Sequence, residues 1–111
     1  MARPPSEFVV SLLELIEPVG AVSWRRMFGG YGLYMEGVMM ALVADEELYF
    51  KTDAQSQPGF VNAGSEPFSY EKNEKTLQMS YWKAPETVFD GPDQMRHWVL
   101  LALAAALRQR K

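Results

Sequence analysis

The feature that most constrains the fold is a change in the spacing of apolar residues near position 24. From Ser6 to Ile16 the apolar residues recur every three or four positions, which predicts an amphipathic helix with Ser6 as its N-cap. From Trp24 onward the spacing becomes two, which is typical of strands with one buried face. A helix followed by closely spaced strands indicates an α+β fold.

Short polar turns separate the predicted strands. Such turns leave no room for the crossover helices that parallel strands require, so neighbouring strands should be antiparallel. The turn at 72–74 contains Asn73, a residue type that tolerates the positive φ of a tight hairpin. We therefore expect an antiparallel meander sheet of about five to six strands. The predicted strands cover residues 24–28, 31–35, 38–44, 48–52, 68–71 and 75–81.

The C-terminal segment predicts a second helix, packed on the sheet. Its residues are apolar almost without interruption from Trp98 to Leu107, so the helix is apolar around most of its circumference. A sheet covers only one side of a helix, and a symmetric dimer is one way to bury the remaining strip. We expect a homodimer in which Leu100, Leu103 and Leu107 are the candidate contacts; coverage by the first helix or a partner is the alternative.

Composition excludes several classes of function. The 111 residues carry a formal net charge of −3, so a basic face for phosphates is absent overall and we expect no specific binding to duplex DNA. The chain has no cysteine, which excludes disulfides and thiolate chemistry and favours a cytoplasmic location. No apolar stretch approaches the roughly 18 residues of a membrane span. The length predicts one domain over residues 1–111.

Catalytic and metal-binding motifs are not found. His97 is the single histidine, and Asp93 four positions earlier adds one more ligand at most, whereas structural zinc takes four. The acidic turn 45–47 lacks the spacing of a calcium loop. No serine elbow accompanies the histidine. We expect no enzyme activity, no cofactor and no metal.

The run Gly29-Gly30-Tyr31-Gly32 is the motif that most suggests a ligand. Glycines let backbone N–H groups approach a phosphate, but this run lacks the Lys-Ser/Thr end of a phosphate loop and opens a strand instead of a helix. A tight turn or bulge is the structural interpretation. A small-molecule-binding or enzymatic domain that uses this turn is the alternative, and a deep polar pocket there would favour it.

Cationic and aromatic residues are interleaved around the same turn. Such interleaving suits an acidic partner peptide or single-stranded nucleic acid. Consecutive strand residues point to opposite faces, so only one of Arg25 and Arg26 can lie on a given surface. The candidate partner-binding residues are Arg25, Arg26, Phe28, Gly29, Gly30, Tyr31, Tyr34, Tyr81 and Trp82.

Several segments together resemble a known family. Residues 25–34 read RRMFGGYGLY, 41–45 ALVAD and 48–53 LYFKTD; PFSY at 67–70, MSYW at 79–82, Pro85-Glu86 and Trp98 with LALAAA at 101–106 follow. From about Trp24 to Arg108 the chain resembles the N-terminal domain of the TfoX (Sxy) family of bacterial competence regulators. It resembles a single-domain member, because the longer regulators carry a second, helical domain.

The resemblance implies a meander sheet between two helices, no enzyme activity, and a link to positive control of competence genes through a transcription activator. The resulting hypothesis is a non-enzymatic, partner-binding regulatory domain that acts as a transcription co-regulator through protein–protein contacts. The alternatives are the small-molecule-binding or enzymatic domain described above and a purely structural homodimer.

Overall fold

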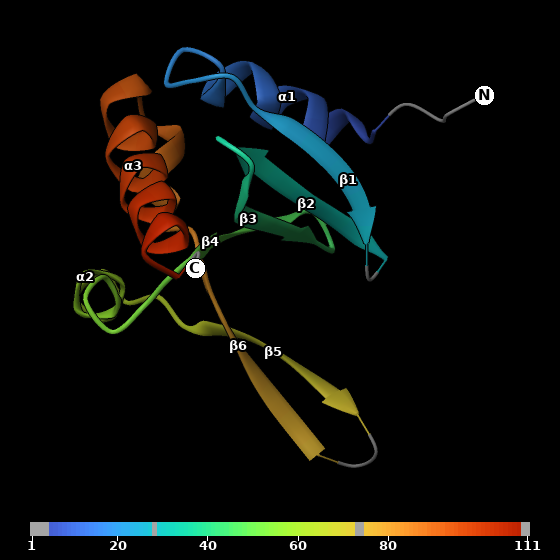
Figure 1. Ribbon diagram of the computed structural model, residues 1–111, viewed down its shortest axis with the longest axis vertical. Helices are drawn as coiled ribbons and strands as arrows, with labels where there is room; N and C mark the ends of the chain where they lie inside the picture. Colours follow the sequence, from blue (N-terminus) through green and yellow to red (C-terminus); the bar gives the residue numbers. More distant parts are fainter. Residues whose placement is uncertain (1–4, 28, 73–74, 110–111) are drawn as a thin grey trace.

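The structure, a computed structural model, describes residues 5–27, 29–72 and 75–109. In this described part, helices pack on one face of a six-stranded antiparallel sheet (Figure 1). The predicted α+β fold is confirmed. The helices are α1 (Glu7–Ile16), α2 (Gln57–Asn62), the 3₁₀ helix η1 (Glu86–Phe89) and α3 (Pro92–Gln109). The strands are β1 (Ser23–Met27), β2 (Gly30–Met35), β3 (Val38–Ala44), β4 (Glu47–Lys51), β5 (Pro67–Lys72) and β6 (Lys75–Lys83).

The first helix forms as its apolar spacing predicts. The Val9 N–H donates to Ser6 Oγ at 3.3 Å, which satisfies one of the free donors at the helix start. Val9, Leu12 and Ile16 lie on one side of α1 and are buried in the core. Neither α1 nor any other described helix is long and apolar enough to cross a membrane.

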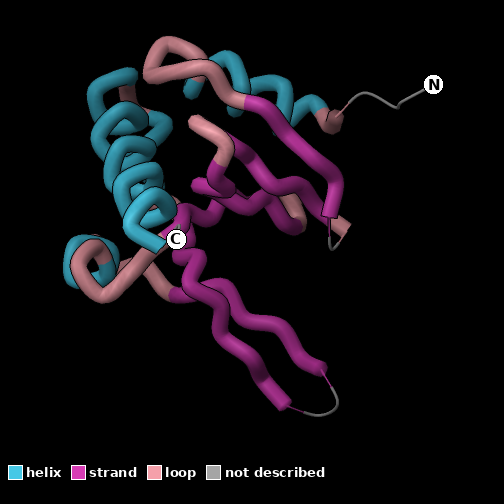
Figure 2. The backbone as a smooth tube through the Cα atoms, in the orientation of Figure 1, coloured by secondary structure: helices cyan, strands magenta, loops and turns pink. Residues whose placement is uncertain are grey.

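The sheet is a meander for four strands and then changes order. Strands β1 to β4 are neighbours in sequence, but β4 pairs with β6, so that β5 lies at the edge. The connection through α2 carries the chain past the position of β6 before β5 begins. Figure 2 shows the β5–β6 hairpin extending beyond the rest of the sheet. The turn predicted around Asn73 lies outside the described residues.

A β-bulge changes the alternation of side chains in β3. Leu33 of β2 pairs with Ala41 and Tyr34 pairs with Met39, so Met40 is an extra residue in β3. Met40 and Ala41 both lie in the core. Met39, which precedes the bulge, and Leu42, which follows it, therefore point to the other face of the sheet.

The last helix is covered by several elements of its own chain. It contacts β3, β4, η1 and α1. Val99, Ala102 and Ala105 are completely buried, and the Trp98 ring meets Phe60 of α2 edge to face with 4.8 Å between ring centres. The expectation that α3 needs cover on more than one side is confirmed, and its own chain supplies most of that cover.

An ion pair joins the end of α3 to the loop before α2. Arg108 Nε and Nη2 donate to the two carboxylate oxygens of Asp53 at 2.6 and 3.0 Å. The Ser56 N–H also donates to Asp53 Oδ1, at 3.0 Å, which closes the turn that leads into α2. The hydrogen bonds from Arg108, followed by those from Ser56, lower the pKa of Asp53 to about 2.

Replacing Trp98 with alanine tests the packing of α3. Trp98 is only 8% exposed, so Trp98→Ala should leave a cavity and reduce the free energy of unfolding by about 3 to 5 kcal/mol. Trp98→Phe should cost much less, because Trp98 Nε1 is buried without an acceptor among the described residues and phenylalanine removes that donor. Urea denaturation measures both; an unchanged midpoint for Trp98→Ala would contradict this packing.

The Asp53–Arg108 pair predicts a specific loss of stability in acid. The pKa of Asp53 is lower in the folded state, about 2, than in the unfolded state, about 4. The ion pair therefore contributes its full stabilisation of the fold above about pH 4, and this contribution is lost as the pH falls towards 2. Wild type should melt at a higher temperature than Asp53→Asn at neutral pH, and the difference should shrink below about pH 4. A difference that is constant down to about pH 2 would show that Asp53 is not held ionised by Arg108.

Candidate functional site

The glycine turn is explained by the backbone alone. Gly29 has φ +75°, a conformation that side chains disfavour, and a Cβ on Gly30 would lie 2.0 Å from the Val43 carbonyl oxygen. The hollow beside the turn holds about 160 Å³ and is lined in part by Asp45 and Glu46. It is smaller than the roughly 300 Å³ of typical small-molecule sites, and its carboxylates repel phosphate. The turn therefore favours the structural interpretation.

Strand alternation divides the predicted hairpin surface into two. Arg26 and Tyr31 lie on the helix-covered side, where Arg26 Nη1 donates to Tyr31 Oη at 3.1 Å and the guanidinium lies 5.6 Å from the Trp24 ring centre. The Ser6 N–H donates to the same hydroxyl, also at 3.1 Å, and is the main reason that the pKa of Tyr31 is lowered. These residues join α1 to the first hairpin.

Trp82 also lies on the helix-covered side, because it pairs with the core residue Phe50. It is half-buried, and its ring centre is 6.5 Å from that of Phe60. Phe28, another candidate residue, lies outside the described residues. Arg26, Tyr31 and Trp82 thus make contacts within the chain on the helix-covered side, and their role in partner binding stays a prediction.

The remaining candidates meet on the second face of the sheet. All helices of the described part pack on the first face, so we call the second one the helix-free face (Figure 1). Strand pairing aligns Arg25, Gly32, Leu42, Tyr49 and Lys83 across five strands. Residues two positions along from these share the same face. The helix-free face, to which the bulge adds Met39, includes Arg25, Met27, Gly32, Tyr34, Met39, Leu42, Glu47, Tyr49, Lys51, Tyr81 and Lys83.

Two cations on this face lie over tyrosine rings and form cation–π contacts. The Arg25 guanidinium lies 5.1 Å from the centre of the Tyr34 ring, and Lys51 Nζ lies 5.1 Å from the centre of the Tyr81 ring. Lys51 also donates to Ser80 Oγ. Burial lowers the pKa of Lys51, although Asp53 partly opposes this. Neither Arg25 nor Lys51 forms an ion pair with a described carboxylate.

Tyr81 is held rigidly beneath Lys51. Its hydroxyl donates to the Met39 carbonyl oxygen at 3.3 Å, and the residue is only 9% exposed. Burial, with a smaller contribution from Tyr34, raises the pKa of Tyr81 to about 12. A hollow of about 350 Å³ lies beside Arg25 and Tyr34, with Glu36 on its lining.

Apolar side chains fill the centre of the face. A Cβ on Gly32 would lie 2.9 Å from Met27 Cε and 3.0 Å from Met39 Sδ, so the two thioethers meet over the glycine. Leu42, paired with Gly32, is only 2% exposed although it lies outside the main core. The helix-free face therefore has a small apolar centre of its own.

The end of the face nearest the β3–β4 turn is acidic. Tyr49 packs edge to face against Phe68 at 4.9 Å. Burial raises the pKa of Tyr49, and the charges of Glu47, Asp45 and Glu66 raise it further. Lys83 Nζ lies 3.8 Å from Glu47 Oε2 and is thereby neutralised. The cations Arg25 and Lys51 and this acidic end give the face two electrostatic poles.

Lys51, Met39 and Tyr49 were missed among the candidate residues. Each is an ordinary member of an alternating strand, and only the pairing of β4 with β6 brings Lys51 to Tyr81. That pairing joins residues about thirty positions apart, which no local pattern reveals.

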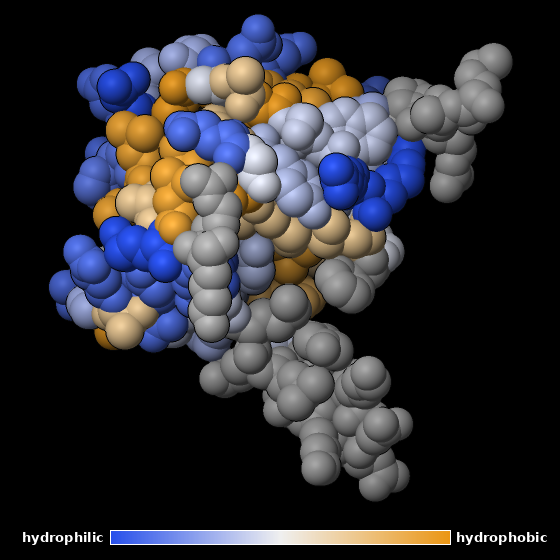
Figure 3. All heavy atoms as spheres, in the orientation of Figure 1, coloured by the Kyte–Doolittle hydropathy of each residue, from blue (hydrophilic) through white to orange (hydrophobic). Residues whose placement is uncertain are grey.

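The candidate dimer residues lie in different environments on α3. Leu100 is 41% exposed, Leu107 is half-buried, and Leu103 is buried against its own chain. In Figure 3 hydrophobic side chains gather over α3. Leu100 is thus the most exposed of the three candidates, and the dimer itself stays a prediction.

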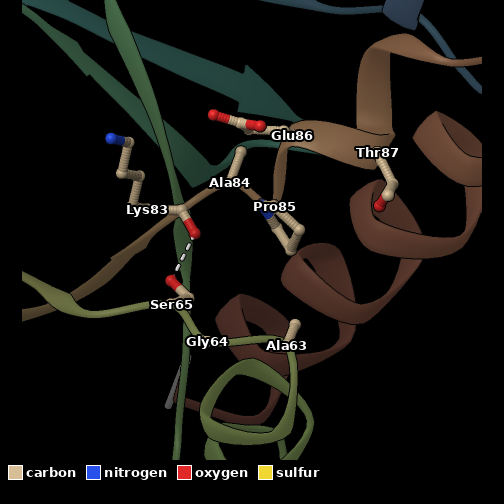
Figure 4. A pocket seen from close by; sticks show the side chains of 8 residues that line it. All are labelled: Ala63, Gly64, Ser65, Lys83, Ala84, Pro85, Glu86 and Thr87. Atoms are coloured by element: carbon tan, nitrogen blue, oxygen red, sulfur yellow. Dashed lines mark hydrogen bonds between the residues drawn. The ribbon is translucent and has the colours of Figure 1, made fainter.

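No other hollow of the described part has the geometry of an active site. The one at the end of β6 holds about 470 Å³ (Figure 4). Its Ser65 hydroxyl donates to the Lys83 carbonyl oxygen at 2.5 Å, and the lining carboxylate of Glu86 lies away from that hydroxyl (Figure 4). His97 and Asp93 are exposed, and the described residues contain no cluster of three or more metal ligands. The hollow is lined by Ala63, Gly64, Ser65, Lys83, Ala84, Pro85, Glu86 and Thr87.

Comparison with known proteins identifies the family. The model of the TfoX N-terminal domain matches residues 14–106. The chain belongs to the TfoX N-terminal domain family. Protein Sxy of Escherichia coli is 25% identical over 97 residues, which cover 87% of this chain and 46% of that protein. The DNA transformation protein TfoX of Haemophilus influenzae is 28% identical over 104 residues, covering 92% and 47%.

A third relative, the DNA transformation protein TfoX1 of Aliivibrio fischeri, is 31% identical over 71 residues, covering 64% of this chain and 34% of that protein. The chain thus spans less than half the length of each of these relatives. Two of these relatives are named DNA transformation proteins, and together with the family match they support a competence-regulator-like domain.

The two turn glycines should respond very differently to alanine. Gly30→Ala places its Cβ against a backbone carbonyl and should destabilise the fold by about 3 kcal/mol or more. Gly29→Ala meets no atom within 4 Å and should cost only about 1 to 2 kcal/mol, the penalty of its positive φ. Thermal melting compares the two, and equal losses would show that close packing at Gly30 is not the reason for the glycine.

Proposed function

We propose that this TfoX N-terminal domain is a non-enzymatic regulatory domain that acts in transcription control by binding a partner protein on its helix-free face. The observation that carries the proposal is the composition of that face. It combines an apolar centre formed by the half-buried side chains of Met27 and Met39 with Arg25 and Lys51, two cations that no described carboxylate neutralises. Protein interfaces typically have an apolar centre surrounded by polar and charged groups.

The names of the relatives support a regulatory role. Two of them are DNA transformation proteins, and the third, Sxy, matches over a similar span. We do not propose duplex DNA as the partner of this domain, because its net charge is −3 and it lacks an extended basic surface for phosphates. A second copy of the chain is the alternative partner, which the 41% exposure of Leu100 on α3 favours.

Gene replacement in the bacterium that encodes the chain tests the proposal. Met39→Glu places a charge in the centre of the helix-free face, whereas Val61→Glu places one on α2 at a residue that is already 57% exposed. Both proteins should melt within a few degrees of wild type. We expect Met39→Glu to alter the same transcripts as deletion of the gene, because a buried charge at an interface centre opposes docking.

The Val61→Glu strain should keep the transcripts of the wild type. The proposal would be contradicted if deletion altered no transcript, or if folded Met39→Glu protein at normal abundance behaved as wild type. RNA sequencing of the four strains supplies the measurement.

A further inference from the structure

The helix-free face carries two cations that form no ion pair with a carboxylate of the described part. Among the described residues the ion pairs are Lys83–Glu47 and Arg108–Asp53, and neither Arg25 nor Lys51 takes part in one. Lys51 is also partly desolvated, which is why its pKa is lowered. A carboxylate that approached Lys51 would recover that lost solvation, so the face is electrostatically suited to an anionic ligand.

The geometry of each cation leaves donors available. Arg25 stacks with its guanidinium over Tyr34, and stacking leaves the N–H groups at the edge of the guanidinium plane free for a bidentate carboxylate. Lys51 uses one of its three donors on Ser80 Oγ. The hollow beside Arg25 and Tyr34 provides room for a side chain.

The spacing of the two cations matches an extended peptide. Arg25 is on β1 and Lys51 on β4, three strand spacings apart and offset by two residues along the strand, a separation of about 15 Å. In an extended chain, residues i and i+4 lie on the same side, about 13 Å apart. Long side chains at these two positions can span the slightly larger separation of the two cations. Residue i+2 would then lie midway between the two cations, between β2 and β3, beside the adaptable thioether of Met39.

We propose that the helix-free face binds an extended acidic segment of a partner protein, with carboxylates at positions i and i+4 on Arg25 and Lys51 and an apolar side chain between them. This proposal rests on the partner-binding function proposed above and adds the chemistry of the partner. The acidic end at Asp45, Glu47 and Glu66 limits the segment, because a longer polyanion would meet repulsion there.

A single nucleic-acid strand fits the face less well. Bases bind by stacking on free aromatic faces, but Tyr34 and Tyr81 each have a ring face occupied by a cation, and Tyr81 is almost completely buried. Tyr49 is packed against Phe68. Two cations are also few for a phosphate backbone that needs several neutralised contacts.

The test uses the full chain and three short peptides with blocked ends. One contains Glu-Thr-Leu-Thr-Glu, the second Gln-Thr-Leu-Thr-Gln and the third Lys-Thr-Leu-Thr-Lys. Backbone NMR shifts measure affinity and location. The first peptide should shift residues of the helix-free face and bind about tenfold more tightly than the second, with the difference falling at high salt.

Charge reversal gives the decisive comparison. The double variant Arg25→Glu, Lys51→Glu should no longer bind the acidic peptide and should bind the lysine peptide instead. The control Arg96→Glu, a single charge reversal at an exposed residue of α3, should leave both affinities unchanged. If the double-reversal variant melts at a much lower temperature than wild type, the milder variant Arg25→Gln, Lys51→Gln replaces it. That variant should also lose the preference for the acidic peptide.

Three results would overturn the proposal that the face binds an acidic segment. The first is equal affinity for the glutamate and glutamine peptides. The second is tighter, Arg25-dependent binding of a ten-nucleotide thymidine strand, and the third is a dimer mass in solution that the double reversal abolishes. If any of these results is found but Met39→Glu still alters the transcripts, the proposal of partner binding stands and only the acidic chemistry of the partner is wrong.

Discussion

The burial of α3 against β3 and β4 is the interaction on which the rest of this structure depends. Val99, Ala102 and Ala105 are completely buried, and the small side chains of the two alanines let the helix approach the sheet closely. The same helix contacts α1 and η1 and receives Phe60 from α2. Every helix of the described part is therefore gathered on one side, which leaves the other face of the sheet uncovered.

Local patterns predicted the fold well because both helices and the first four strands are set by nearby residues. Ser6 and the spacing of Val9, Leu12 and Ile16 determine α1 without reference to the rest of the chain. The order of the last two strands was not predictable in this way. The pairing of β4 with β6 depends on how the long connection through α2 folds, and its residues carry no signal of that pairing.

The candidate surface was predicted only in part for the same reason. The rule that Arg25 and Arg26 face opposite sides is confirmed, but the sequence alone did not reveal which of them faces the helices. Tyr81 and Trp82 were grouped although alternation separates them. Lys51 joined the surface only through a long-range pairing, and Met39 only through the bulge in β3.

That bulge has a consequence for sequence change in this family. Met40 is an additional residue that lets β3 present Met40 and Ala41 to the core while Met39 and Leu42 both point to the helix-free face. Deleting the extra residue Met40 would restore regular alternation and leave Met39 and Leu42 on the helix-free face, whereas deleting a residue of β3 outside the bulge would reverse the orientation of every side chain on one side of the deletion. The bulge is thus the place where β3 can lose one residue at the cost of a single core side chain, whereas a change of length elsewhere in the strand would exchange the core with the helix-free face.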